Sequence, residues 1–370
     1  MLCFVHSSDW QLGMPFNWAE GDAGAKLRAL RMEGIDRLGE LAKEKQAQFI
    51  LVAGDLFDAN TVSERIVIEA CERIAALPVP VFVIPGNHDH GGPGSIYRHD
   101  SFGKNKPENM TVMTEKEPLT CQDWQVCFFP APLLQRHEAH DPTEHITAES
   151  GEPGFFRIGI AHGSIRRFDQ SGDGTVYNLI DPRRAKLAKL DYLALGDWHG
   201  TEQIDARTWF SGAHEPTNFK GNDTGNALLV RISEVGAVPE VEKLHVAKSQ
   251  WLHQSFSLFN REDIEALRQW ITNLDSPRHA LLELELKGAL SLADLSEVDE
   301  LVRELSHRLL VLRTERRALL PAASEDELDA LAADGYVRMA VERLRELQGS
   351  GDVAAARALQ LLHQLKHQPC

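Results

Sequence analysis

The chain has 370 residues and a formal net charge of −16 at pH 7, with 43% hydrophobic and 25% charged residues. These are ordinary values for a globular protein, and they exclude a disordered or fibrous chain. The length is sufficient for two or three domains. The acidic balance argues against a protein that holds nucleic acid through a broad basic surface.

The cysteine spacing and the first residues of the chain bear on the cellular compartment that we expect for it. The five cysteines show no CxxC spacing, which disfavours both a disulfide framework and a zinc site held by cysteines. The opening MLCFVHSSD lacks the basic region and long apolar run of a signal peptide. No apolar stretch approaches the roughly 20 residues that span a bilayer. We therefore expect a cytoplasmic protein that does not contact a membrane.

The first 90 residues alternate short apolar runs with helical patterns. The predicted strands are Leu2–His6, Phe49–Ala53 and Val81–Ile84, and the predicted helices are Lys26–Ala42 and a second one that Ser63 caps. A strand–helix–strand–helix–strand order predicts right-handed crossovers and a largely parallel sheet, hence an α/β fold.

The remainder of the chain divides into three parts. Residues 131–156 are polar and predict a surface loop. Strands then resume without obvious helices and predict a second sheet packed on the first: Arg157–Ala161, Tyr192–Leu195, Thr208–Ser211, Ala227–Ile232 and Val241–Val246. A small α+β domain is predicted from Glu262–Leu274, Ala280–Leu286, Leu292–Arg308 and Leu309–Thr314. The pattern is helical from Ser324. The expected domains are therefore 1–250, 260–317 and 324–370.

Five of the predicted strands end in polar clusters. These clusters are HSSDWQLG at 6–13, GDLFD at 54–58, PGNHD at 85–89, HG at 162–163 and GDWHG at 196–200. Sites in open α/β sheets assemble at the carboxyl ends of the strands, so the five clusters can meet in one cleft. Aspartate, asparagine and histidine are the hard-to-borderline ligands that suit Mn²⁺, Fe²⁺, Zn²⁺ or Mg²⁺. Each cluster alone could be a turn, but all five in order favour a functional site.

This ordered set resembles the calcineurin-like metallophosphoesterases, whose pattern is DxH, GDxxD, GNH[DE], a lone His and GHxH. The opening HSSDWQLG is most similar to SbcD-type DNA-repair nuclease subunits, which begin HTSDWHLG. The resemblance covers residues 1–235 by motif, and 260–317 only by the order of its elements. It implies a four-layer α/β/β/α sandwich, a small α+β capping domain and C-terminal helices.

Carried over by position, the resemblance implies two divalent metal ions bridged by Asp55. The first ion would be held by Asp9, Gln11 and His199, and the second by Asn87, His162 and Asp197. His88 would be the general acid or would stabilise the transition state, with Asp58 positioning it. Mn²⁺ fits this ligand set best, with Mg²⁺ and Fe²⁺ as alternatives.

Two positions depart from the family pattern. Gln11 stands where the family has a histidine, and its neutral amide oxygen predicts weaker metal binding at the first site. Asp197 replaces the first histidine of GHxH and adds a charge and a hard oxygen, which favours Mn²⁺ or Mg²⁺. Both replacements fit an active enzyme with an altered metal preference, and both also fit a partly degenerate site retained for binding.

The resemblance implies a DNA nuclease, exonuclease or endonuclease, that works in DNA repair with an SbcC-like coiled-coil ATPase docked on residues 324–370. It also suggests a homodimer. Arg166 and Arg167 are candidates for substrate binding, although a solvated helix face would carry the same residues. One alternative is a metallophosphoesterase acting on a small phosphodiester or a phosphoprotein. The other is a DNA-end-binding scaffold with a degenerate site that regulates its ATPase partner.

Overall fold

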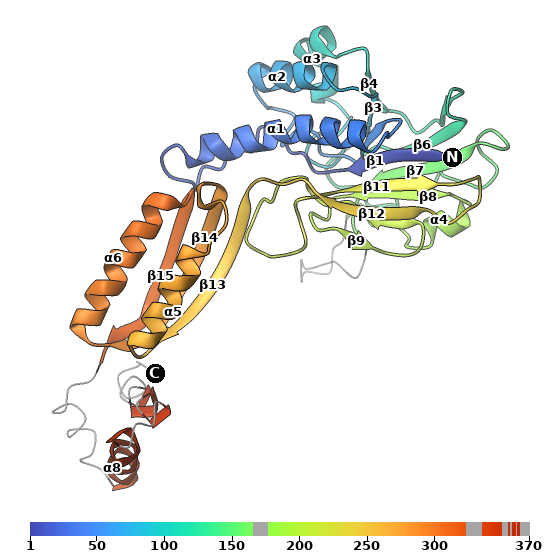
Figure 1. The fold of residues 1–370 in the computed structure, drawn as a ribbon. Helices are drawn as coiled ribbons and strands as arrows, with labels where there is room; N and C mark the ends of the chain where they lie inside the picture. Colours follow the sequence, from blue (N-terminus) through green and yellow to red (C-terminus); the bar gives the residue numbers. More distant parts are fainter. Residues whose placement is uncertain (166–176, 323–334, 350–353, 356, 360, 363–370) are drawn as a thin grey trace. The chain divides into compact units, whose positions relative to one another are not determined.

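The computed structural model describes residues 1–165, 177–322, 335–349, 354, 355, 357–359, 361 and 362 (Figure 1). Arg166 and Arg167 lie outside the described residues. The chain divides into two compact units, Met1–Ser249 and Gln250–Cys370. The second unit begins before residue 260 because the strand that opens it belongs to its sheet.

Two six-stranded sheets form the first unit. The first sheet has, in spatial order, β12 (Glu240–His245), β11 (Asn226–Ile232), β1 (Leu2–Ser7), β2 (Ile50–Val52), β3 (Val81–Val83) and β4 (Met110–Val112). The second has β5 (Leu119–Cys121), β6 (Val126–Ala131), β7 (Phe156–His162), β8 (Tyr192–Gly196), β10 (Thr208–Phe210) and β9 (Glu202–Gln203). Strands β1 to β4 are parallel, as are β6, β7, β8 and β10, while the outer pairings are antiparallel. The fold is therefore mixed α/β.

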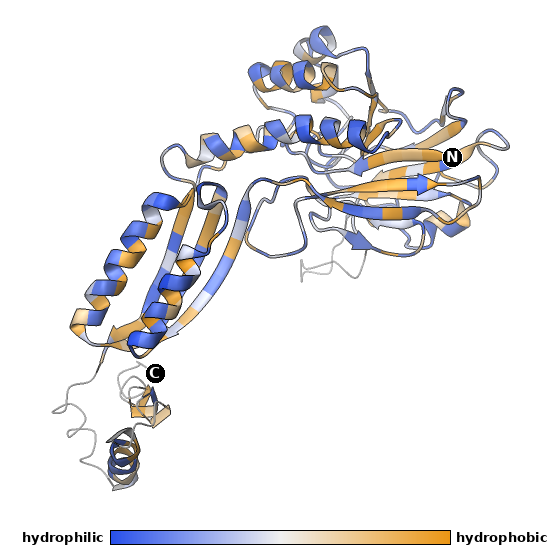
Figure 2. Ribbon diagram, in the orientation of Figure 1, coloured by the Kyte–Doolittle hydropathy of each residue, from blue (hydrophilic) through white to orange (hydrophobic). Residues whose placement is uncertain are grey.

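The main core lies between the two sheets. Phe4 and Phe49 of the first sheet stack with ring centroids 4.9 Å apart, and Phe128 of the second sheet meets Phe49 edge-on at 5.3 Å. The central strands of both sheets, such as β1, β11, β6 and β8, are buried on their two faces and predominantly hydrophobic, as Figure 2 shows for β1 and β11. Continuous apolar runs in the sequence are the expected signature of such strands.

The outer face of the first sheet is covered by helices. These are α1 (Ala23–Glu44), α2 (Glu64–Ala75), the 3₁₀ turn η1 (Ile96–Arg98) and α3 (Asp100–Asn105). Ser63 is the N-cap of α2, as predicted, but its side chain makes no capping hydrogen bond. On the second sheet, α4 (Arg184–Leu187) is a single turn, and within the described ranges loop side chains such as Ile146, Ile165 and Ile180 complete the cover. The outer layer there is thus thinner than the predicted four-layer sandwich.

Three features of the first unit correct the sequence prediction. The strands predicted at 227–232 and 241–246 lie in the first sheet rather than the second, because β11 pairs antiparallel with β1 and β12 pairs with β11. Strands β4, β5, β6 and β9 were not predicted; β4, β5 and β9 have two or three residues each, too short for a periodic pattern. Residues 132–155 contain no strand or helix, yet Leu133, Thr143 and Ile146 are buried, so this loop is not purely a surface feature.

The second unit opens with a parallel three-stranded sheet. Its elements are β13 (Gln250–Leu258), α5 (Arg261–Thr272), the 3₁₀ turn η3 (Pro277–His279), β14 (Ala280–Leu290), α6 (Leu292–Arg308) and β15 (Val311–Pro321). Asn260 and Asp263 form a reciprocal capping box at the start of α5. Apolar side chains of all three strands pack under both helices. The sequence prediction omitted β13, because alternating polar residues such as His253 and Ser255 weaken its apolar pattern.

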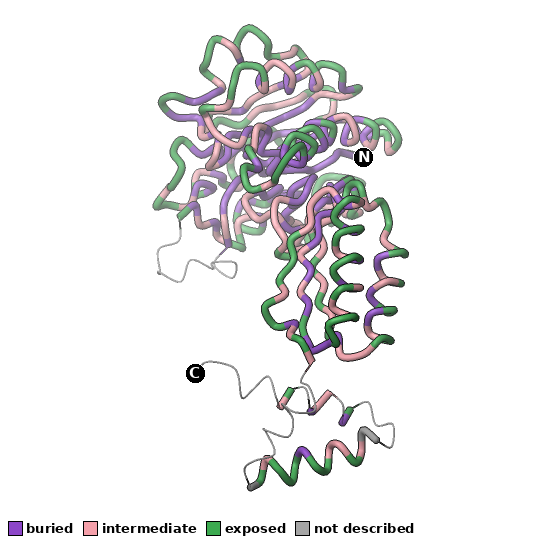
Figure 3. Tube along the Cα trace, turned by 90° about the vertical axis from the view of Figure 1, so that its left-hand side faces the viewer, coloured by how far each residue is buried: buried purple, intermediate pink, exposed green. Residues whose placement is uncertain are grey.

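The last described helix is α8 (Gly335–Gly349), which forms a small separate cluster with residues near Leu359. Figure 3 shows the buried residues concentrated in the strands of the first unit, whereas α8 is mostly exposed. Among the helices that the structure describes, none is long and apolar enough to cross a membrane.

One glycine in α1 yields a stability test. A Cβ at Gly34 would lie 2.1 Å from Cδ2 of the buried His214 ring, whereas a Cβ at Gly103 in α3 would meet no atom within 4 Å. Gly34→Ala is expected to lower the free energy of unfolding by about 1–3 kcal/mol through overpacking, despite the better helix propensity of alanine. The control Gly103→Ala should be neutral or stabilise by up to about 1 kcal/mol. Thermal unfolding followed by circular dichroism measures both, and equal effects would contradict this packing.

Candidate metal centre

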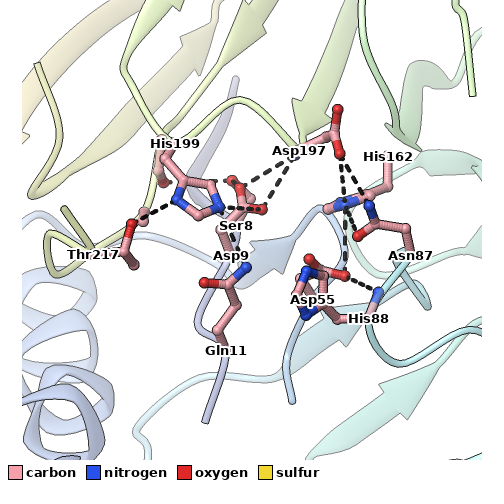
Figure 4. A network of polar contacts seen from close by, with 12 residues as sticks. Ser8, Asp9, Gln11, Asp55, Asn87, His88, His162, Asp197, His199 and Thr217 are labelled. Atoms are coloured by element: carbon pink, nitrogen blue, oxygen red, sulfur yellow. Dashed lines mark hydrogen bonds and ion pairs between the residues drawn. The ribbon is translucent and has the colours of Figure 1, made fainter. Parts of the chain in front are cut away.

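The loops after β1, β2, β3, β7 and β8 meet at one place in the first unit (Figure 4). Because β1, β2 and β3 run parallel in the first sheet and β7 and β8 run parallel in the second, the carboxyl ends of these strands lie at one edge of each sheet. The structure brings together Asp9, Gln11, Asp55, Asp58, Asn87, His88, His162, Asp197 and His199. All of the predicted metal-site residues therefore share one site, and their individual roles stay predictions.

The backbone of this site is strained. Asp9, Gln11, Asp55 and Asp197 have φ values of 54°, 42°, 55° and 95°, in the left-handed region that non-glycine residues avoid. Each such residue costs roughly 1–3 kcal/mol and persists only when its surroundings enforce it. Two backbone hydrogen bonds enforce it here, from Asp9 N to Gly54 O (3.1 Å) and from Gln11 N to Asp55 O (2.8 Å). The strain aims the side chains of both loops at a common point.

Asp9, Asp55 and His162 form the centre of the cluster. Each offers one ligand atom, all three atoms lie within 4.8 Å of one another, and all three residues are buried. The Nδ1–H of His162 donates to the carbonyl of Ala53 (2.8 Å), which leaves Nε2 facing inward. That nitrogen lies 3.5 Å from Asp55 Oδ1 and 3.8 Å from Asp197 Oδ1.

The electrostatics of this centre favour a cation. Burial raises the pKa of Asp55 and of Asp197, because their charged forms lose hydration. Burial also opposes protonation of His162, but the carboxylates of Asp55, Asp9 and Asp197 outweigh it and raise the pKa of the imidazole. The clustered carboxylates thus keep a proton on His162, and a divalent ion can take the place of that positive charge.

Asn87 completes the side of the site around His162. Its Oδ1 lies 3.3 Å from His162 Nε2, and its Nδ2 donates to Asp197 Oδ1 at 3.3 Å. An amide oxygen, an imidazole nitrogen and two carboxylates are hard-to-borderline donors of the kind that Mn²⁺ and Mg²⁺ accept. The donor set therefore fits the implied second ion.

His199 and Gln11 form the other side of the site. The ring of His199 is held through Nδ1 by Thr217 Oγ1 (2.8 Å), and its Nε2 lies 3.8 Å from Asp9 Oδ1. Burial lowers the pKa of His199, so its neutral form is favoured. The amide nitrogen of Gln11 donates to His199 Nε2 at 3.3 Å, while Gln11 Oε1 is buried and has no hydrogen-bond partner among the described residues. Turning the amide over places this oxygen beside the same nitrogen, so Gln11 fits the first ion as a ligand.

His88 is held beside Asp55 and Asp58. Its backbone N–H donates to Asp55 Oδ1 (2.9 Å), and its ring Nδ1 contacts the backbone carbonyl of Asp58 at 2.7 Å. The Asp58 carboxylate is farther from Nδ1, at 3.9 Å. Asp58 therefore positions the imidazole mainly through its main chain rather than through its side chain. The other ring nitrogen, Nε2, is left for substrate.

Sequence reasoning missed Arg31, a buried arginine that holds the first ligand loop. Its guanidinium donates to the carbonyls of Trp10 (2.7 Å), Asp9 (2.8 Å) and Glu215 (2.9 Å). Burial lowers the pKa of Arg31 to about 10, so it remains charged near neutral pH. A signal was present, because Arg31 lies on the apolar face of α1 between Leu27 and Ile35.

Asp89 and Thr217 were also given no role by the sequence. Asp89 is fully buried and accepts from Gly86 N (2.7 Å), Phe57 N (3.1 Å) and Tyr97 Oη (2.5 Å). It therefore ties the loops after β2 and β3 together. Its place in the GNHD motif was visible, whereas nothing in the sequence near Thr217 indicated its contact with His199.

Comparison with known proteins agrees with this geometry. The calcineurin-like phosphoesterase family model matches residues 4–234. The uncharacterized metallophosphoesterase YhaO of Bacillus subtilis (strain 168) is 31% identical over 261 residues, which cover 66% of this chain and 60% of that protein. The solved structure of TT1561 of Thermus thermophilus is 12% identical with a TM-score of 0.39, covering 66% of this chain and 99% of that one. The chain spans less than two thirds of YhaO.

Metal binding should be visible as thermal stabilisation. With Mn²⁺ at about a hundred times its Kd, the melting temperature is expected to rise by roughly 5–10 °C, since a ligand that binds only the folded state stabilises it by about 2.7 kcal/mol at that excess. Asp55→Asn should remove most of the rise, because Asp55 lies at the centre of the cluster. Asp123→Asn, an exposed aspartate in the β5–β6 turn, is the control.

Gln11→His refines that measurement, because imidazole is the stronger ligand for Mn²⁺. We expect half of the full rise at a lower Mn²⁺ concentration in this variant than in the wild type. An equal Mn²⁺-dependent rise in melting temperature in the wild type and in Asp55→Asn would show that the cluster of Asp9, Asp55 and His162 holds no ion.

Proposed function

Because this chain belongs to the calcineurin-like phosphoesterase family, we propose that it hydrolyses phosphodiester bonds in DNA at a centre of two divalent metal ions. Membership of the family supports metal-dependent hydrolysis of a phosphoester as the class of reaction. DNA as the substrate, nuclease activity in repair and an SbcC-like ATPase partner are the further steps of the proposal.

The observation that carries the proposal is the convergence of Asp9, Asp55 and His162 on one point, with His88 bonded to the central carboxylate. Asp9, Gln11 and His199 would hold one ion, and Asn87, His162 and Asp197 the other. Asp55 lies between the two sets, with its Oδ1 3.5 Å from His162 Nε2. A pair of divalent ions supplies Lewis acidity and activates water for attack on a phosphodiester.

In this proposal the residues of the chain hold the carboxylates in place and deliver a proton. The strained loops fix the carboxylates before substrate arrives, so little reorganisation is needed during the reaction. His88, with Nδ1 fixed against the Asp58 carbonyl, presents Nε2 to the departing sugar oxygen and can deliver a proton to it. To deliver that proton, His88 must first carry one on each ring nitrogen: Nδ1–H donates to the Asp58 carbonyl, Nε2–H goes to the departing oxygen, and the neutral Nδ1–H tautomer remains.

Two further observations support DNA as the substrate. The opening HSSDWQLG is most similar to SbcD-type subunits. A compact unit of residues 250–370 follows the metal-binding unit, and a minimal phosphatase has no need of it. The net charge of −16 opposes DNA binding, so we propose that the chain holds DNA weakly without metal ions and a partner.

Hydrolysis assays test the proposed reaction. With Mn²⁺, the wild type should cleave plasmid and oligonucleotide DNA, and His88→Asn should lower kcat by about 10²–10⁴-fold while keeping the Mn²⁺-dependent rise in melting temperature. His307→Asn, an exposed histidine on α6, is the matched control. Bis(4-nitrophenyl) phosphate serves as the small-substrate comparison.

The alternatives predict other outcomes. A protein that cleaves bis(4-nitrophenyl) phosphate but no DNA is a phosphodiesterase for small substrates. A folded protein that cleaves neither and retains no metal by elemental analysis is a scaffold with a degenerate site. Either result would overturn the nuclease proposal.

The proposed ATPase partner would dock on α8. Val337, Val341 and Leu344 pack into the local cluster with Leu359 and Leu362. Tyr336 and Met339, one turn apart, remain 93% and 69% exposed. Exposed apolar side chains spaced i, i+3 are what a helix offers to a groove or to a coiled coil.

A double variant that introduces two negative charges tests this docking. Tyr336→Glu with Met339→Glu should abolish co-purification with a co-expressed coiled-coil ATPase, because two carboxylates would have to be desolvated in the interface. Arg343→Ala, also exposed on α8, is the control. Undiminished co-purification of the double variant would show that α8 does not form the interface.

A further inference from the structure

A rigid turn stands beside the loop that carries Asn87 and His88. Leu133 N donates to Pro85 O at 3.2 Å, and Gly91 N donates to Leu133 O at 2.8 Å. These two bonds join residue 133 to both ends of the 85–91 loop. The turn of residues 134–138 therefore begins at the edge of the metal centre, on the side of His88.

Asn178 fixes the other end of this turn. Its side chain accepts from Glu138 N (2.7 Å) and donates to Arg136 O (3.0 Å), and its backbone N–H donates to Glu138 O (2.8 Å). The carbonyl of Asn178 also accepts from Ser164 N (3.0 Å), two residues after the predicted ligand His162. Asn178 is buried with φ of 54°, a strained conformation that these bonds maintain. The turn is thus built onto two loops of the metal centre.

The turn presents an arginine to solvent. Arg136 is exposed, and among the described residues its guanidinium has no hydrogen-bond or ion-pair partner. It is nevertheless close enough to act on Asp58: burial raises the pKa of this carboxyl, and the positive charges of His88, Arg31 and Arg136 oppose that rise. An exposed arginine on a turn that is hydrogen-bonded to the loop of His88, with no partner among the described residues, is suited to binding a phosphate.

An aromatic pair stands next to this arginine. The ring of His137 lies 4.8 Å from that of Tyr177, and both side chains are exposed. Tyr177 directly precedes Asn178, so the same hydrogen bonds that fix the turn also fix this pair. Exposed rings beside a cation are the usual platform for a nucleobase, because stacking accepts any base and the cation holds the backbone.

We infer that Arg136, His137 and Tyr177 form a subsite for the nucleotide next to the scissile phosphate, with Arg136 binding its flanking phosphate and Tyr177 stacking its base. This inference rests on the proposed function, since it takes single-stranded or frayed DNA as the substrate. With this subsite, the chain would recognise DNA through a local contact beside His88. A broad basic surface is then unnecessary, which reconciles the acidic chain with a nucleic-acid substrate.

The test compares a long and a short substrate. Arg136→Gln should lower kcat/KM for a single-stranded oligonucleotide about tenfold or more relative to bis(4-nitrophenyl) phosphate, which has no flanking phosphate. The salt dependence of oligonucleotide binding should also lose about 0.7 of its log–log slope, the contribution of one phosphate contact. Arg136→Lys should restore part of the loss, and Tyr177→Ala should weaken oligonucleotide binding about 5-fold or more.

A matched control and the contrary outcomes keep the inference distinct from the proposed function. Arg183→Gln removes the same charge from an exposed arginine that is paired with Asp181 at 2.9 Å, and it should change neither substrate. Equal losses on both substrates in Arg136→Gln, or no loss on either, would overturn the subsite. A wild type that hydrolyses only bis(4-nitrophenyl) phosphate would instead overturn DNA as the substrate.

Discussion

The mutual repulsion of Asp9, Asp55 and Asp197 is the constraint on which the rest of the site depends. Asp9 and Asp55 are almost completely buried, and all three residues have left-handed backbone conformations. Such carboxylates cannot all be charged in a medium of low dielectric without a cation near them. Without metal ions, protonated His162 supplies part of this charge. The site is therefore an arrangement that a bound metal cation would complete.

The surrounding protein opposes this repulsion with fixed donors. Both Asp9 carboxylate oxygens are within reach of Asp197 N, at 3.2 and 3.3 Å, and Ser8 Oγ donates to Asp9 Oδ2 at 2.5 Å. Arg31 contributes a full charge but bonds only carbonyl oxygens of the loops, so it stabilises their backbone without occupying the carboxylates. The carboxylate lone pairs that face the centre remain available for ions.

Much of the fold was predictable from the sequence because local pattern and tertiary structure agree. The parallel strands at 2–7, 50–52 and 81–83, and the helix at Leu292–Arg308, follow directly from apolar runs and helical spacing. The placement of β11 and β12 in the first sheet was not predictable, because which edge a strand joins depends on long-range pairing such as Leu2 with Ile232. Short strands such as β4 carry too few residues to show a period.

The sequence predicted the polar residues at the strand ends of the candidate site but not the residues that support them. The residues at the strand ends were visible because five polar clusters follow predicted strands in order, although each cluster alone could be a turn. The supporting residues were hidden because their types are common elsewhere: Thr217 and Asn178 act through contacts with residues far away in the chain. Gln11 was singled out as a departure from the family pattern, but only its unpartnered Oε1 shows that it can serve as a ligand.

The spacing of these contacts along the chain has a consequence for folding kinetics. Arg31 joins Asp9 across 22 residues, whereas the bond between Asp9 and Asp197 joins residues 188 apart. The first ligand loop and α1 can therefore organise early as a local unit, while the full centre closes only after β8 has docked. If the centre closes after the transition state for folding, ions that bind only the closed centre slow unfolding rather than accelerate folding. Bound metal would thus act as a late cross-link that prolongs the lifetime of the folded state.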